Sequence, residues 1–275
     1  MKCLIIGAGG IVGQEMQACV PDSVEAVFTR TKDFNITSEA SIYQFLDNLK
    51  PEAILNLSGQ NNVDIVEKDP EQFIFINEIA PEIISNWCWS NNAYMIQGST
   101  QGVFSGDNAN YSAEDIPNPI TNYGKQKRNA EISVSSLANS LIARLTFVYG
   151  IRLDNTFGRV NPLEQMMGEE NQLQVNDRFF SPLWSRDAAN ILWDLLLERR
   201  TGFVHLGQPI KMSRYDLACH CAWDTVRIMH IKKVSHEFFK GIAQRPYNTT
   251  WNSGSLYNTS IEEAILTSYL EWRDR

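Results

Sequence analysis

Tyr123 and Lys127 lie four residues apart in the segment 122–127, NYGKQK. If this segment is helical, both side chains lie on one face of the helix, one turn apart. A phenol loses its proton near pH ~10, and a nearby ammonium favours the phenolate, so Lys127 is expected to lower the pKa of Tyr123. Such a pair can donate and accept a proton near neutral pH. The same short pattern also fits an ordinary surface helix, so its meaning depends on the remaining sequence.

A glycine-rich turn follows the first predicted strand. The apolar run 1–6 is typical of a buried parallel strand, and it leads directly into the sequence GAGGIVG. Three glycines have the spacing of a strand-to-helix turn that lets the backbone approach a pyrophosphate. The helix expected over residues 14–19 then points its amides at the phosphates. The residues expected to bind the dinucleotide here are Gly7, Gly10, Ile11, Val12 and Gly13.

The end of the second predicted strand indicates which dinucleotide is bound. A site that prefers NAD places an Asp or Glu there to bind the ribose 2′-hydroxyl. After the strand 26–29 this chain instead continues with Arg30, Thr31 and Lys32. Two cations and no carboxylate suit a 2′-phosphate, so NADPH is the expected cofactor and NADH is the alternative.

Strands and helices alternate over the first 150 residues, which predicts a doubly wound parallel α/β sheet of the Rossmann type. The polar loop 58–62 and the hydroxyls of Ser99 and Thr100 follow strands, at the edge where such sheets bind ligands. The remaining elements are expected as helices over 38–49, 70–90 and 186–198, and strands over 53–57, 94–97, 141–148 and 203–206.

The pattern loosens after residue 150, which suggests two parts. Residues 1–150 are expected to form the dinucleotide-binding domain, with additional segments near 172–206. Residues 151–275 are expected to form a smaller substrate-binding part that covers the sheet edge.

Composition narrows the choice of partners and compartment. The 275 residues carry a net charge of −8, which argues against a nucleic-acid surface. The sequence shows neither an apolar run of membrane-spanning length nor a signal peptide, so a cytoplasmic protein without membrane contact is expected, and a homodimer is compatible with it. Five scattered cysteines suit a reducing compartment. The sequence CHC at 219–221 would place its side chains on different faces of a helix, so no metal is expected.

Taken together, the glycine-rich turn, Thr100 and the Tyr123–Lys127 pair resemble the extended short-chain dehydrogenase/reductases. Further segments are similar to the dTDP-4-dehydrorhamnose reductase family in particular, and they cover nearly the whole chain. These segments are VDIVEKDPE at 63–71, STQGVF at 99–104, PNP at 117–119, VYG at 148–150 and Arg245-Pro246.

The resemblance implies an NADPH-dependent oxidoreductase that reduces the C4 ketone of a nucleotide-linked 6-deoxysugar, for surface polysaccharide synthesis. Tyr123 would donate the proton, Thr100 would hydrogen-bond the developing alkoxide, and Lys127 would hold the nicotinamide ribose and keep Tyr123 acidic. The cofactor residues implied in addition to the glycine-rich turn are Arg30 at the 2′-phosphate, Asn35 and Ile36 at the adenine, and Leu57, Ser58 and Gly59.

The chain departs from the family where the sugar would lie. Gln101 and Gly102 replace an acidic and an aromatic residue, and Phe147 replaces a tryptophan. With Arg245, these are the candidate substrate residues, and the departures suggest a different 4-keto sugar nucleotide. Two alternatives stay open: an epimerase or dehydratase on the same fold, and a non-catalytic regulatory subunit that kept the dinucleotide fold.

Overall fold

Six parallel strands form the central sheet of the computed structural model, which describes residues 1–151, 163, 173–225, 231–238, 241–252 and 259–274. The strand order is β10-β5-β4-β3-β1-β2, and each neighbouring pair is parallel. The strands are β1 Lys2–Ile6, β2 Glu25–Thr29, β3 Ala53–Asn56, β4 Tyr94–Thr100, β5 Ser140–Leu145 and β10 Gly202–Leu206. The predicted doubly wound α/β sheet is therefore confirmed.

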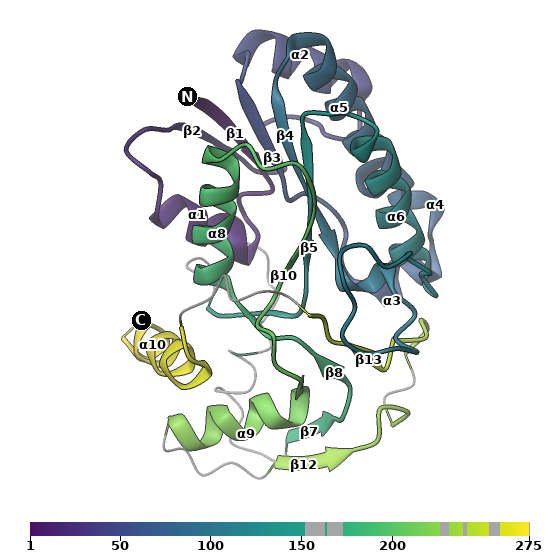
Figure 1. Ribbon diagram of the computed structural model, residues 1–275, viewed down its shortest axis with the longest axis vertical. Helices are drawn as coiled ribbons and strands as arrows, with labels where there is room; N and C mark the ends of the chain where they lie inside the picture. The colour runs from purple at the N-terminus through teal and green to yellow at the C-terminus, as the bar shows by residue number, and fades with distance from the viewer. Residues whose placement is uncertain (152–162, 164–172, 226–230, 239–240, 253–258, 275) are drawn as a thin grey trace.

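Helices cover both faces of this sheet (Figure 1). One face carries α1 (Ile11–Ala18) and α8 (Ser185–Leu197), and the other carries α2 (Glu39–Leu49), α5 (Ala80–Asn91) and α6 (Asn122–Ser135). Alternate side chains of the strands supply the two apolar layers, because successive residues of a strand point to opposite faces. Thus Ile5 packs with α1 and α8, whereas Leu4 packs with α2 and α5.

The second half of the chain contributes both to the sheet and to a smaller layer at its carboxyl edge. Strand β10 completes the sheet by pairing with β5, and helix α8 packs beside α1 on one of its faces. Below them in Figure 1, short strands and two helices surround a separate apolar cluster. These elements are β6 Val148–Tyr149, β7 Leu173–Asn176, β8 Phe179–Phe180, β9 Leu183–Trp184, β11 Met212–Ser213, α9 Arg214–Asp224, β12 Ile231–Val234, β13 Asn248–Thr249 and α10 Ile261–Arg273. Part of the expected substrate-binding region, including 152–162 and 164–172, lies outside the described residues.

The helix expected over residues 70–90 is interrupted. It consists of α4 (Glu71–Ile74), a π-helical turn (Phe75–Ile79) and α5, and a further helix, α3 (Val63–Lys68), precedes it. In the π-helical turn the Ala80 amide bonds to the carbonyl of Phe75, five residues earlier. Pro81 at the next position has no amide to donate and its ring crowds the preceding turn, which favours this wider geometry.

The strand expected over residues 141–148 ends early, at Leu145. The next residue, Thr146, still bonds through its amide to the Leu206 carbonyl, but its hydroxyl turns away and donates to Gln101. Phe147 turns towards Phe180, with the ring centroids 4.8 Å apart. The mostly apolar sequence of this segment did not predict the bend. The bend places Thr146 and Phe147 in the cleft described below.

Candidate active site

Two glycines in the turn after β1 are required by close backbone packing. Gly7 has φ +88°, and a Cβ there would lie 2.8 Å from the carbonyl carbon of Leu57. A Cβ on Gly13 would lie 2.7 Å from the Cα of Ala8, so any side chain would push α1 away from the turn. Close packing of the turn on the loop after β3 and on α1 therefore requires glycine at both positions, and a turn of this kind lets a pyrophosphate approach the backbone.

A cavity of about 490 Å³ opens above this edge. It brings together every residue of the glycine-rich turn named from the sequence, the loop after β3, and the three candidate catalytic residues. The lining includes Gly7, Gly10, Ile11, Val12, Gly13, Leu57, Ser58, Gly59, Thr100, Tyr123 and Lys127. We call this cavity the dinucleotide chamber.

Three other residues expected at the cofactor do not line this chamber. Arg30 directly follows β2, whose last residue accepts a hydrogen bond from the Gly7 amide, so Arg30 lies beside the glycine-rich turn. The backbone amide of Arg30 donates to the Asp33 carboxylate at 2.6 Å. An acidic group therefore lies close to Arg30, although none was expected from the sequence. The side-chain oxygen of Asn35 accepts two hydrogen bonds from Thr37, and Ile36 is buried in the core.

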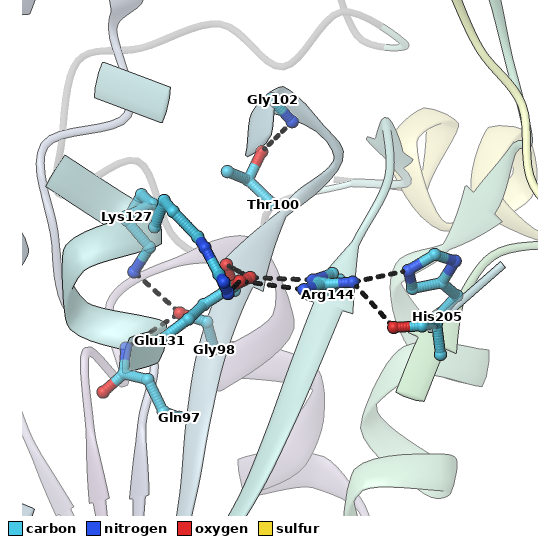
Figure 2. Close-up of polar contacts among 11 residues, drawn as sticks. Gln97, Gly98, Thr100, Gly102, Lys127, Glu131, Arg144 and His205 are labelled. Atoms are coloured by element: carbon cyan, nitrogen blue, oxygen red, sulfur yellow. Dashed lines mark hydrogen bonds and ion pairs between the residues drawn. The ribbon is translucent and has the colours of Figure 1, made fainter. Parts of the chain in front are cut away.

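Thr100 and Tyr123 both line the dinucleotide chamber. Thr100 ends β4, and its hydroxyl oxygen accepts a hydrogen bond from the Gly102 amide at 3.1 Å (Figure 2). Tyr123 lies in the first turn of α6, which begins after Thr121, whose hydroxyl oxygen caps the Gly124 amide. Burial raises the pKa of Tyr123 to about 12, and its hydrogen bond with Thr100 partly opposes that rise.

The expected effect of Lys127 on Tyr123 is wrong for this structure. Lys127 lies one turn further along α6, but its ammonium is buried and donates to the Gly98 carbonyl of β4 at 2.7 Å (Figure 2). Burial lowers the pKa of Lys127 to about 8, and the Glu131 carboxylate partly opposes this. Desolvation, which the four-residue spacing does not reveal, therefore dominates the pKa values of both side chains and keeps the phenol protonated.

A buried ionic network lies behind Lys127 and was not predicted. Glu131, one further turn along α6, accepts hydrogen bonds from Ser99 at 2.6 Å and from Arg144 at 2.8 and 2.9 Å. Arg144 also contacts the His205 ring at 3.2 Å, which links α6 to β5 and β10 (Figure 2). Burial, and then the Arg144 charge, lower the pKa of His205 to about 3, so this ring is neutral. The signal was present in the sequence, because an arginine in an apolar strand needs a buried partner.

A second, smaller cavity of about 150 Å³ adjoins the first, and we call it the arginine chamber. Both cavities share Val63, Thr100, Gln101, Tyr123 and Phe147. All four candidate substrate residues, Gln101, Gly102, Phe147 and Arg245, line the arginine chamber. Two lining residues, Arg178 and Arg214, were missed, because the loosely patterned second half gave no sign that they would converge.

Within the part of the chain that the structure describes, no group of three or more His, Cys, Asp or Glu side chains is arranged to hold a metal ion. The cysteines of the 219–221 segment lie on α9, where Cys221 is buried in the apolar cluster and His220 faces Asp224 at 3.6 Å.

The whole sequence, residues 1–275, matches the family described as RmlD substrate binding domain. Methionine adenosyltransferase 2 subunit beta of Mus musculus is 26% identical over 100% of this chain and 90% of its own length. A dTDP-4-dehydrorhamnose reductase of Aggregatibacter actinomycetemcomitans is 24% identical, with 99% and 96% covered. The crystal structure of a dTDP-4-dehydrorhamnose reductase from Bacillus anthracis in complex with NADP superposes with a TM-score of 0.90, at 23% identity, covering 98% of this chain and 99% of that one.

Proposed function

The chain belongs to the RmlD substrate binding domain family, and from this premise we propose that it is an NADPH-dependent reductase of the C4 ketone of a nucleotide-linked 6-deoxysugar. One observation carries the proposal. Thr100 and Tyr123 lie at the boundary that the dinucleotide chamber shares with the arginine chamber. A hydride donor in the first and a carbonyl in the second would meet there, beside a group that can supply a proton.

The dinucleotide chamber fits NADPH. Gly7, Gly10 and Gly13 line it without side chains, and α1 begins at its edge. Arg30 follows β2 and is our candidate for the 2′-phosphate, with NADH as the weaker alternative. When bound, the nicotinamide supplies the hydride. The phenol of Tyr123 holds its proton at neutral pH, so it can give that proton to an alkoxide. The Thr100 hydroxyl is placed to hydrogen-bond the same oxygen.

Location and assembly are part of the proposal. All five cysteines are free, which favours a reducing compartment, and we assign the protein to the cytoplasm. No helix among the described residues is long and apolar enough to cross a membrane. We also infer that the chain can act as a homodimer and that residues 1–150 and 151–275 divide the cofactor and substrate roles, with 172–206 returning to the sheet.

A second candidate function is regulatory. Several relatives at 24–26% identity are named as the beta subunit of methionine adenosyltransferase 2, and they match 94–100% of this chain. On this alternative the chain would bind a dinucleotide and a methionine adenosyltransferase without catalysing reduction. The presence of Thr100, Tyr123 and Lys127 in one chamber favours the reductase, because a binding module does not need all three. An epimerase or dehydratase is distinguished by a dinucleotide that stays bound through purification.

The test is NADPH oxidation, followed by its absorbance, with a dTDP-4-keto-6-deoxysugar as substrate. Wild type should turn over, and Tyr123→Phe should be slower by at least about 100-fold with nearly unchanged NADPH affinity, because it loses the general acid. Turnover unimpaired in Tyr123→Phe would remove this residue from the mechanism. Tight NADPH binding without turnover on a panel of 4-keto sugar nucleotides would favour the regulatory alternative.

A further inference from the structure

Two amide side chains are buried opposite each other at the carboxyl ends of neighbouring strands. Asn56 ends β3, Gln97 pairs with it on β4 in the parallel register, and neither side chain has contact with solvent. The next residue of β4 is Gly98, where a Cβ would lie only 3.1 Å from the Asn56 carbonyl oxygen. Interior strands of a parallel sheet normally carry apolar residues, because a buried amide costs desolvation energy. The pair therefore needs a reason beyond the packing of the sheet.

Both amides belong to one continuous chain of hydrogen bonds that ends at the ammonium of Lys127. Ser58 donates to Asn56 Oδ1 through its backbone amide at 3.1 Å and through its hydroxyl at 2.5 Å. Asn56 Nδ2 donates to Gln97 Oε1 at 2.9 Å, and Gln97 Nε2 donates to the Gly98 carbonyl at 2.8 Å. Lys127 donates to the same carbonyl, so the Gly98 oxygen accepts two hydrogen bonds (Figure 2). We call this series of bonds the Asn56–Gln97 chain.

The direction of the Asn56–Gln97 chain is fixed at its first member. A backbone amide can only donate, so the Asn56 atom that faces Ser58 must be the side-chain oxygen. The Asn56 nitrogen then faces Gln97, which turns its oxygen to Asn56 and its nitrogen to the Gly98 carbonyl. That carbonyl has two lone pairs, and Gln97 and Lys127 occupy one each. Gln97 therefore decides which side of the Gly98 oxygen is open to the ammonium.

The two ends of the Asn56–Gln97 chain both line the dinucleotide chamber, whereas Asn56 and Gln97 themselves do not. Ser58 reaches the chamber from the loop after β3, and Lys127 reaches it from α6. A buried network in which each amide is paired holds its members rigidly. The loop after β3 and the ammonium of Lys127 therefore keep a fixed relative position across the chamber.

We propose that Asn56 and Gln97 are positioning residues, which hold the ammonium of Lys127 where it binds the nicotinamide ribose of the dinucleotide. An ammonium has three N–H donors, and Lys127 uses one of them on Gly98, so the other two can serve the ribose hydroxyls. A donor that is held in place before the ligand arrives loses less freedom on binding, which improves affinity. The identity of the ligand rests on the proposed function, whereas the effect of Gln97 on Lys127 rests on their shared acceptor.

The first experiment measures NADPH affinity by fluorescence titration in a double-mutant cycle of Gln97→Met and Lys127→Met. Gln97→Met alone should weaken NADPH by about 3- to 10-fold, the loss expected for one misplaced hydrogen bond. In the Lys127→Met protein the same substitution should have no further effect, because the group that Gln97 positions is absent. A purely structural loss would not imitate this result, since unfolded protein lowers the number of binding sites and not the affinity of the folded ones.

Gln126→Met is the matched control. Gln126 is a buried glutamine next to Lys127 on α6, but it donates to the Pro70 carbonyl at 2.8 Å and accepts from Asn77 at 2.9 Å, and so belongs to a different network. Its replacement should leave NADPH affinity nearly unchanged. Equal losses in Gln97→Met and Gln126→Met would overturn the proposal, as would an effect of Gln97→Met that is the same with and without Lys127.

The second experiment needs no dinucleotide. Gln97→Glu would put a carboxylate beside the ammonium, which should raise the pKa of Lys127 from about 8 by at least about 1, whereas Gln126→Glu should raise it less. Lysine side-chain NMR measures this pKa, with the signal identified by its loss in Lys127→Met. An equal pKa in both variants would overturn the proposal.

The two proposals fail separately. A dependence of Lys127 on Gln97 in both experiments, without turnover of any 4-keto sugar nucleotide, refutes the reductase alone. Turnover by a protein whose NADPH affinity and Lys127 pKa are indifferent to Gln97 refutes the positioning role alone.

Discussion

Glu131 and Arg144 form a bidentate ion pair in which neither side chain has appreciable contact with solvent. The pair links α6, which carries Tyr123 and Lys127, to β5 in the middle of the sheet. A buried ion pair costs desolvation energy and contributes little net stability over apolar residues, but removing one partner leaves an uncompensated charge. The pair therefore fixes α6 against the sheet and makes the position of the candidate catalytic helix sensitive to either side chain.

Replacing Glu131 with Gln should lower the free energy of unfolding by about 3–5 kcal/mol, because Arg144 would keep its charge in a buried site. Urea denaturation at neutral pH measures this change. Glu25→Gln provides the control, since Glu25 is exposed and lies 3.8 Å from Lys2, in a pair expected to contribute less than about 1 kcal/mol. Similar losses in both variants would show that the buried pair has no special role.

Gly13→Ala should destabilise the protein even without a dinucleotide, because its Cβ would meet backbone atoms of Gly7 and Ala8 at 2.7 Å. Overpacking of this kind typically costs about 1–3 kcal/mol. Gly10→Ala is the matched comparison: it has φ −72°, and its Cβ would find a single neighbour, at 3.4 Å. Thermal unfolding of the cofactor-free variants measures both, and a larger loss for Gly10→Ala would contradict the packing argument.

The sequence predicted the sheet, because alternating apolar strands and amphipathic helices report directly on burial. It also predicted the glycine-rich turn and placed Thr100 with Tyr123, since both follow from local spacing and from strand order. The four candidate substrate residues were found through resemblance. These features depend on near neighbours in the chain or on the edge at which parallel strands end.

Features that depend on three-dimensional convergence were missed. Arg178 and Arg214 are 36 positions apart on either side of α8 and β10, and no periodicity indicates that their side chains share a cavity. The pKa of Tyr123 was predicted from its spacing to Lys127 alone, whereas burial dominates the pKa values of both side chains. The early end of β5 likewise reflects the hydrogen bond from Thr146 to Gln101, and the mostly apolar sequence of this strand did not predict that bond.

Arg30→Ala should weaken NADPH by about 10- to 100-fold and NADH by much less, because the lost charged hydrogen bonds would be made to the 2′-phosphate. Fluorescence titration of the two cofactors measures the ratio. Lys50→Ala is the control, since Lys50 lies at the other end of the sheet, just after α2. Equal weakening of NADPH and NADH in Arg30→Ala would refute the 2′-phosphate assignment.

Lys127 should make stability depend on pH in a defined window. Its pKa falls from 10.5 to about 8 on folding, so between these values the unfolded chain holds more protons than the folded one. The contribution of Lys127 to the free energy of unfolding must then rise as the pH rises from about 8 to 10.5, by about 3 kcal/mol in total. Lys127→Met removes the titration, so the difference in unfolding free energy between wild type and variant should shift in favour of wild type across that window. Urea denaturation at several pH values between 7 and 10.5 measures this difference, and a difference that stays constant with pH would show that Lys127 is not desolvated.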